Sequence, residues 1–481
     1  MRKGIFFNLL SRFFFIAGSY VMHMVLARIM GPADYGNFGF CLSILMISYV
    51  LTNNGVWQVV SRLVSSQPGA SGAILTQGLL VQLFLSGILA FGLAIFAVPL
   101  SNLFGSHVLV MPFYLLAAII ILQALTMVYS GVLIGMKSFF RESIIGTTNA
   151  ILRAILPVSF AILLTGNRLF GSMLGFLLVL LITLVMSAFL VRPLGKTHLT
   201  SSLSSMVRES IPVMVAFGMI TFLRYVDLLS IKILLSDPNV TGFYNAASAA
   251  AQLPFLAMYS FGTVSYPYVT ESMNVGDLAA AAKTIESSMR YALVVVIPLV
   301  LVIGIFSQPL INFVYSSMYS SAAGPMSILI IGQLLLGVFY IFAQYLAGIN
   351  RSNIVIGIAS LTTLVSVLLN IWLIPRYGII GAAIATTIAA TVGTSLVLFS
   401  AKRTFHISLK VFGKFGVIAI SIVILNLLLN KNIAGNTMLL RGVAVMFSYL
   451  LSLLAMRVVS WSEVASVFSR LRGMGNRANV R

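Results

Sequence analysis

The feature that most constrains this chain is the recurrence of apolar stretches long enough to cross a membrane. A helix needs about 20 apolar residues to span the hydrocarbon core, and fourteen such stretches follow one another between short polar breaks. Only 8% of the residues are charged, whereas a typical soluble domain has about 25%. A water-soluble globule is therefore excluded, and the pattern predicts an all-α polytopic membrane protein of about 14 transmembrane helices. The approximate spans are 8–29, 36–60, 74–98, 109–134, 143–164, 170–191, 210–235, 242–269, 290–314, 325–348, 354–374, 379–400, 411–429 and 438–457.

The positive charge is unevenly divided between the two sides that these spans define. The chain has 29 Lys and Arg against 9 Asp and Glu, a formal net charge of +20, which in a soluble protein would suggest nucleic-acid binding. With both termini placed in the cytoplasm, twenty basic residues fall in cytoplasmic segments and four in outer ones. Because this bias follows the positive-inside rule, we expect a multi-pass protein of the cell membrane with cytoplasmic termini and no nucleic-acid partner.

Two pairs of similar turns indicate an internal repeat. Residues 28–36 (RIMGPADYG) and 232–242 (KILLSDPNVTG) each join a cation, a Pro/Asp turn and a glycine. A second pair begins at Gly135 and Gly348, and the two pairs are separated by 206 and 213 residues. Six spans is an even number, so the halves are parallel, as in transporters that bind substrate between repeats. The expected domains are a six-helix lobe over 1–200, a second over 201–405, two extra helices over 406–460 and a basic cytoplasmic tail over 461–481.

Ionisable side chains inside the spans are the candidate functional residues, because inserting one costs about 2.5–3.5 kcal/mol. One acid, Asp227, lies deep in a span and is the candidate for coupling to H⁺ or Na⁺. Arg binds phosphate oxygens through two parallel N–H donors, so cations in the spans are candidates for binding an anionic headgroup. These cations are Arg12, Arg28, Arg153, Arg224 and Lys232.

Each candidate also has a structural interpretation. Cations near the ends of spans, such as Arg12, Arg28 and Lys232, can extend to the membrane surface, whereas Arg153 is too deep to do so. Arg224 and Asp227 are three residues apart and can form a pair on one helix face. The histidines and the lone cysteine lack metal-ligand spacing, and Gly-Lys-Ser/Thr does not occur, so neither a metal nor a cofactor is expected.

Two segments of the sequence resemble those of a known family. Residues 26–36 (LARIMGPADYG) are similar to the first-loop signature of polysaccharide flippases, and residues 370–386 (NIWLIPRYGIIGAAIAT) to their second recurring block. These Wzx-like flippases belong to the multidrug/oligosaccharidyl-lipid/polysaccharide (MOP) exporter superfamily. The resemblance implies an inverted V of two lobes around a central cavity, and a transporter rather than an enzyme. It further implies translocation of a polyprenyl-pyrophosphate-linked oligosaccharide, with membrane lipids, a coupling ion and other polysaccharide-assembly proteins as further partners.

Alternative functions remain open on the sequence alone. Multidrug exporters of the same superfamily carry small cations, and the lipid II flippases share the architecture but have a charge cluster in the first span and loop that this sequence lacks. A membrane glycan polymerase or ligase is disfavoured because the outer breaks are too short to hold catalytic residues.

Overall fold

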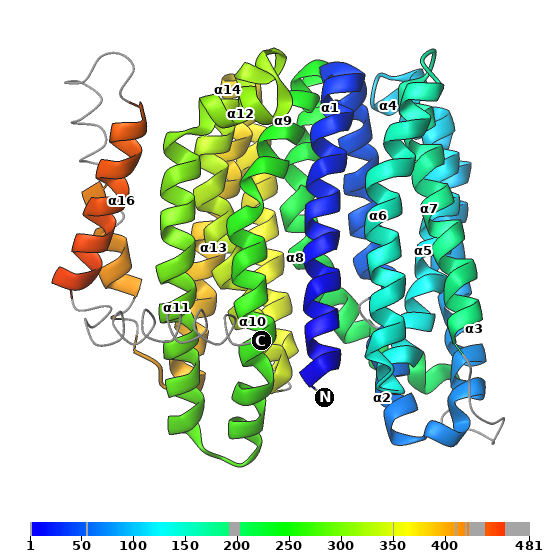
Figure 1. Cartoon of the computed structure of the whole chain (residues 1–481), viewed down its shortest axis with the longest axis horizontal. Coiled ribbons are helices and arrows are strands. Elements are labelled where there is room, and N and C mark those ends of the chain that lie inside the picture. The colour runs from blue at the N-terminus through cyan, green and yellow to red at the C-terminus, as the bar shows by residue number, and fades with distance from the viewer. Residues whose placement is uncertain are drawn as a thin grey trace, which may run out of the picture. The chain divides into compact units, whose positions relative to one another are not determined.

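The computed structural model describes residues 2–53, 56–191, 203–349, 351–408, 410, 412–418, 421–422 and 438–456. Regular structure in these residues is helical, without strands. Three short 3₁₀ helices, η1 (Pro68–Ala70), η2 (His107–Leu109) and η3 (Ser317–Ala322), accompany the α-helices. The α-helices (Figure 1) are α1 Arg2–Asn53, α2 Val56–Ser66, α3 Ser71–Ile95, α4 Ala97–Leu103, α5 Val110–Gly135, α6 Phe139–Leu163, α7 Arg168–Leu190, α8 Leu203–Leu235, α9 Pro238–Ala251, α10 Leu253–Asn274, α11 Leu278–Ile305, α12 Ser307–Tyr315, α13 Ala323–Gly348, α14 Ser352–Phe405 and α16 Met438–Ala455.

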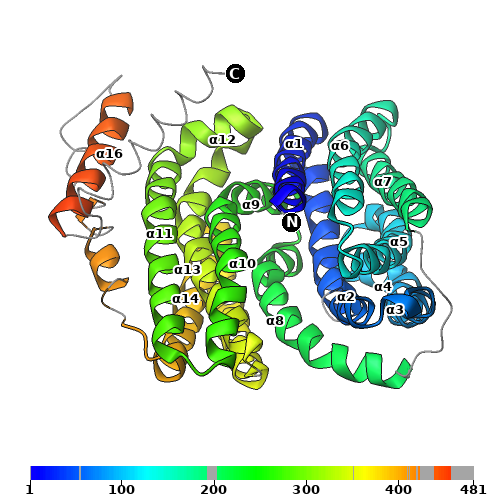
Figure 2. The same cartoon turned by 60° about the horizontal axis from the view of Figure 1, so that its bottom comes forward.

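The chain divides into two compact units that interleave along the sequence. The first comprises Met1–Ala251, Gln308–Gly332 and Arg351–Gly393, and the second comprises Gln252–Ser307, Gln333–Asn350 and Thr394–Arg481. Within the first unit, α1, α3, α5, α6 and α7 pack side by side, which both views show (Figures 1 and 2). The predicted division into two six-helix lobes, two extra helices and a tail stays a prediction. Residues 423–437 and 457–481 of its last parts lie outside the described residues.

In the longest helices, α1 and α14, two predicted spans are joined at one glycine, although the span 36–60 continues past the end of α1 into α2. Gly31 has φ 74° inside α1, and Gly378 has φ 56° inside α14. These positive φ values lie in the region where side chains other than glycine are disfavoured, so each glycine ends one helical leg and starts the next. The spans predicted over 8–29 and 36–60, and over 354–374 and 379–400, are therefore connected without a loop.

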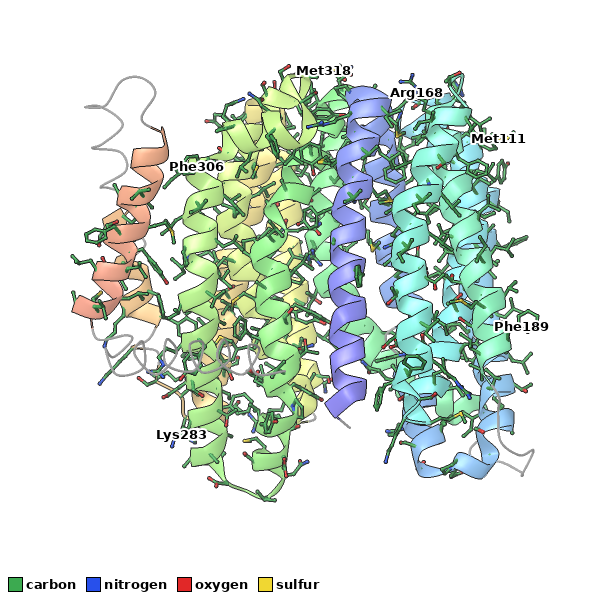
Figure 3. The ribbon with its side chains drawn as sticks, viewed as in Figure 1. Met111, Arg168, Phe189, Lys283, Phe306 and Met318 are labelled. Carbon is green, nitrogen blue, oxygen red and sulfur yellow. The ribbon has the colours of Figure 1, made fainter. Side chains whose placement is uncertain are left out.

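The turn at Gly31 leaves carbonyl groups of the first α1 leg without helical partners, and side chains supply the donors. The Tyr319 hydroxyl of η3 donates to the Ala27 oxygen at 2.8 Å, and the Arg168 guanidinium at the start of α7 donates to the Ile29 oxygen. Arg168 and Met318 lie at the end of the first unit remote from the N-terminus (Figure 3). This end is therefore held together by hydrogen bonds between distant segments.

The helical membrane class predicted from the sequence is confirmed. Seven helices in the described part of the chain are long and apolar enough to cross a membrane, among them the double-length α14. Helices coincide with each predicted span up to residue 400, whereas most of the span 411–429 lies outside the described residues. Fully buried Val60, Ile74 and Val132 join α2, α3 and α5 in one apolar core.

Candidate functional site

Arg153 occupies the interior of the first unit, midway along α6. Its side chain is only 4% exposed, and the guanidinium lies over the Phe176 ring of α7, 4.5 Å from the ring centroid. The Tyr49 hydroxyl of α1 also interacts with it. A desolvated cation over an aromatic face gains roughly 2 kcal/mol, which offsets part of the cost of burying the charge.

Arg224 of α8, like Arg153, interacts with side chains of α1. Its guanidinium is 5.7 Å from the centroid of the neighbouring Tyr225 ring, and it interacts electrostatically with Tyr20 of α1. One turn further along α1, His23 interacts with Arg153. Because Tyr20 and His23 are three residues apart, they share a helix face. The structure thus brings Arg153 and Arg224 to one strip of α1, which we call the α1 strip (Tyr20 and His23).

A buried aromatic cluster adjoins the α1 strip. The His23 Nδ1 is 2.9 Å from the Tyr35 hydroxyl, and the Tyr35 ring packs on Tyr315 and Tyr319 at centroid distances of 6.1 and 5.9 Å. Tyr35 is fully buried. Sequence reasoning missed these residues, although Tyr35 lies in the first-loop signature. The position of Tyr35 within this signature was the one feature of the sequence that could have identified it.

Asp227 forms a second buried polar centre that links three helices. Its carboxylate accepts from the Tyr244 hydroxyl of α9 at 2.5 Å and the Thr386 hydroxyl of α14 at 2.9 Å. The backbone N–H of Leu228 donates to it at 2.7 Å. Three donors satisfy most of the acceptor capacity of a carboxylate. Sequence reasoning found Asp227 but missed Tyr244 and Thr386.

Lys232 and Arg28 have their hydrogen-bond partners outside the α1 strip. Lys232 is fully buried, and its Nζ donates to the Asn37 Oδ1 at 2.8 Å, so this side chain does not extend to the membrane surface. Arg28 is exposed and donates to the backbone oxygens of Val314, at 3.0 Å, and of Phe313 at the end of α12. The backbone of Arg12 is in α1, but its side chain lies outside the described residues.

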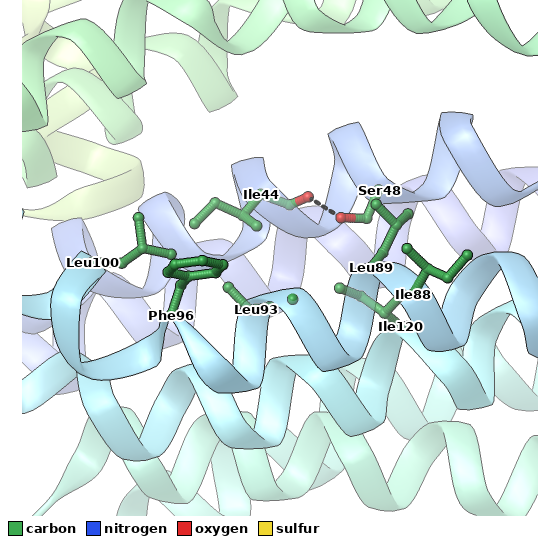
Figure 4. Close-up of a pocket in the computed structure, with 9 residues that line it drawn as sticks. Ile44, Ser48, Ile88, Leu89, Leu93, Phe96, Leu100 and Ile120 are labelled. Carbon is green, nitrogen blue, oxygen red and sulfur yellow. Dashed lines mark hydrogen bonds between the residues drawn. The ribbon is translucent and has the colours of Figure 1, made fainter.

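An apolar groove opens on the first unit, separate from all these residues (Figure 4). It has a volume of about 380 Å³ and is lined by residues of α1, α3, α4 and α5, including Ile44, Ile88 and Leu100, and by Phe96 between α3 and α4. Its lining hydroxyl, Ser48, donates to the Ile44 oxygen at 2.9 Å. The groove suits hydrocarbon, and the lining contains no candidate for anion binding.

Comparison with protein families shows to which family the chain belongs. The profile of the family described as "polysaccharide biosynthesis protein" matches residues 1–273, more than half of the sequence. The chain belongs to the polysaccharide biosynthesis protein family. The polysaccharide family to which residues 26–36 and 370–386 pointed is thereby confirmed.

Two proteins are similar to this chain in sequence. An uncharacterized membrane protein of Methanocaldococcus jannaschii is 24% identical over 408 residues, 80% of each chain. The probable low-salt glycan biosynthesis flippase Agl15 of Haloferax volcanii is 25% identical over 175 residues, 36% of this chain and 37% of that one.

The fold itself is found in solved structures. The inward closed conformation of the lipid II flippase MurJ is similar, with a TM-score of 0.76, 17% identity, and coverage of 92% of this chain and 97% of that one. An inward-facing MATE family multidrug transporter of the MOP superfamily is similar with a TM-score of 0.66 and 14% identity, and the match covers 80% of this chain and 95% of that one. The fold is therefore that of polytopic helical transporters.

Proposed function

We propose that this protein is a flippase that moves a polyprenyl-pyrophosphate-linked oligosaccharide from the inner to the outer leaflet of the cell membrane. The observation that carries the proposal is the pair of arginines, Arg153 and Arg224, which both interact electrostatically with the α1 strip. A diphosphate brings negative charge into the membrane and requires compensating cations. Arg offers a planar fork of donors that matches phosphate oxygens.

Alternating access accounts for the movement. In the proposed cycle the headgroup enters a cavity between two six-helix lobes, the inner side closes and the outer side opens, while the polyprenyl tail stays in lipid. Family membership and the similarity to the probable glycan biosynthesis flippase Agl15 support this substrate class. Both termini are proposed to be cytoplasmic, because that orientation places most cations inside.

Asp227 is the proposed site of ion coupling. A carboxylate held by Tyr244 and Thr386 joins α8, α9 and α14, so a change of its charge alters hydrogen bonds to two other helices at once. Protonation, or binding of Na⁺, would change the relative energies of the two access states, since a ligand shifts an equilibrium by its differential affinity.

The experiment is a translocation assay in proteoliposomes with a fluorescent polyprenyl-diphosphate-linked oligosaccharide, read by quenching from one side. Arg153→Ala and Arg224→Ala are expected to insert normally and lose translocation, whereas Arg153→Lys retains part of it. The matched control is Arg376→Ala, an exposed arginine over the Trp372 ring, which is expected to transport normally. Undiminished translocation by both site variants would contradict the cationic site.

The runner-up function is a multidrug exporter of the same superfamily, coupled to H⁺ or Na⁺. Asp227 is the observation that favours this function, because an organic cation in the membrane needs an acidic partner. The same proteoliposomes separate the two functions. Export of an organic cation that is lost in Asp227→Asn, without movement of the glycolipid, would establish the exporter. A glycan polymerase or ligase would instead lengthen the oligosaccharide.

A further inference from the structure

The two repeated turns of the sequence lie directly against each other in the first unit. A Cβ atom added to Gly36 would overlap the backbone oxygen of Pro238 and would lie 2.6 Å from the Gly242 nitrogen. A Cβ atom added to Gly242 would overlap the oxygen of Pro32 and lie 2.7 Å from its carbonyl carbon. Such distances are too short for any side chain, so both contacts require glycine.

These contacts are reciprocal in the register of the repeat. Pro32 corresponds to Pro238 and Gly36 to Gly242, each 206 residues further along the chain. Each glycine therefore packs on the proline of the other half. This is the arrangement expected of an interface built around a two-fold axis, in which residue i contacts j and the equivalent of j contacts the equivalent of i.

Polar contacts surround the glycines. The Asn245 side chain donates to the Tyr35 oxygen at 3.3 Å, and a Cβ on Gly39 would overlap that asparagine. Asn37 accepts from the buried Lys232. The contact between α1 and the α8–α9 connection thus combines close backbone approach with specific hydrogen bonds.

We propose that Pro32, Gly36, Pro238 and Gly242 form a latch that closes one end of the transport pathway. The proposal rests on the proposed function in that it assumes alternating access. If the two halves of the predicted repeat are the bodies that move in the cycle, opening at this end separates the two turns. Because neither glycine has a side chain, the two turns can approach closely, and this close contact stabilises the closed state.

The test measures exposure of a buried reporter beside the latch. Cys41 is the single cysteine and is fully buried, so Cys41→Ala provides the background. Thr241 is fully buried next to Gly242, and Thr241→Cys is the reporter, labelled in intact cells with a membrane-impermeant maleimide. Gly36→Ala and Gly242→Ala are each expected to raise the labelling rate about tenfold, the change produced by a shift of about 1.4 kcal/mol.

The matched control is Gly87→Ala in α3, where an added Cβ meets nothing within 4 Å. It makes the same change in a helix interior and is expected to leave the labelling rate unchanged. Equal labelling in parent, Gly36→Ala and Gly242→Ala, or an equal increase in Gly87→Ala, would overturn the latch. Because labelling requires no transported substrate, this result is independent of whether the proposed glycolipid is the cargo.

A cross-link decides the case in which the glycine variants do not reach the membrane. The side chains of Gly39→Cys and Asn245→Cys would occupy the same space, within reach of a disulfide, whose Cβ–Cβ separation is about 3.8 Å. In the Cys41→Ala background, oxidation is expected to stop translocation and reductant to restore it. If the fully oxidised protein translocates as fast as the protein treated with reductant, the proposal is overturned.

Discussion

Two buried charges in the first unit, Arg153 and Asp227, are held in opposite ways. Arg153 lies over an aromatic ring and beside a phenol, neutral partners that attract a cation without fixing its orientation tightly. Asp227 accepts three hydrogen bonds at 2.5–2.9 Å from α8, α9 and α14. The difference indicates that the first site is suited to exchanging partners during a cycle, whereas the second, while its carboxylate is charged, holds three helices in one geometry.

The largest expected effect follows from removing the carboxylate. Asp227→Ala leaves the buried Tyr244 and Thr386 hydroxyls without their acceptor, and each unsatisfied group costs about 1–3 kcal/mol. We expect unfolding in detergent to become easier by about 3 kcal/mol, measured by denaturant titration. Asp227→Asn is the matched variant, which keeps an acceptor oxygen and loses the charge. If Asp227→Ala is as stable as the parent, the carboxylate does not hold the helices.

Arg153→Met should separate function from stability at the other site. Replacing a buried charge by an apolar side chain of similar volume is often neutral or stabilising, so the unfolding midpoint should not fall. Two lost charge-assisted hydrogen bonds to a diphosphate, at roughly 1.5–3 kcal/mol each, predict at least about a 100-fold loss of translocation. A variant that loses stability and transport together would place Arg153 with Asp227 as a structural charge.

Phe176→Leu sharpens the same contrast with a smaller change. The leucine keeps an apolar contact and removes the ring face beneath Arg153, which costs roughly 2 kcal/mol for a desolvated cation. We expect a drop of that size in the free energy of unfolding and a modest loss of transport. The Arg153→Met/Phe176→Leu double variant should show no further loss of stability, because the cation–π contact is already absent.

The smallest effect concerns a carboxyl at the turn, outside the predicted spans. Burial raises the pKa of Asp34, and attraction by Arg168 lowers it by less. The folded chain therefore binds this proton more tightly than the unfolded chain, and the resulting stabilisation at low pH is lost as the pH rises through the folded pKa. Asp34→Asn should be more stable than the parent at pH 7, by less than about 1 kcal/mol for this partly exposed group, and equally stable at pH 3. A variant less stable at pH 7 would show that the ion contact with Arg168 dominates.

Much of the fold could be predicted from the sequence, because apolar length and polar breaks determine where helices cross a membrane. The depth of Arg153 was also predictable, since it lies near the middle of a span. The partners of these residues were not. Phe176 is one of many phenylalanines, and Thr386 lies within a recurring block without a charge to mark it. Both act through tertiary contacts that span spacing does not encode.

Lys232 and the repeated turns illustrate the same limit. Proximity to a span end suggested that Lys232 could reach the membrane surface, but its position is determined by Asn37, 195 residues away. The repeat of Gly36 and Gly242 was visible in the sequence. That the two copies touch each other depends on how the halves pack, and this required the structure.

The turn at Gly31 has a further consequence for the length of the chain. Because a single residue departs from helical geometry there, the connection contains no slack. One inserted residue would rotate the second leg by about 100° relative to the first, turning the fully buried Phe38, Phe40 and Leu45 away from the core. Insertions and deletions at this turn should therefore be excluded more strictly than most substitutions. The number of residues between the two legs is as much a part of the fold as their identity.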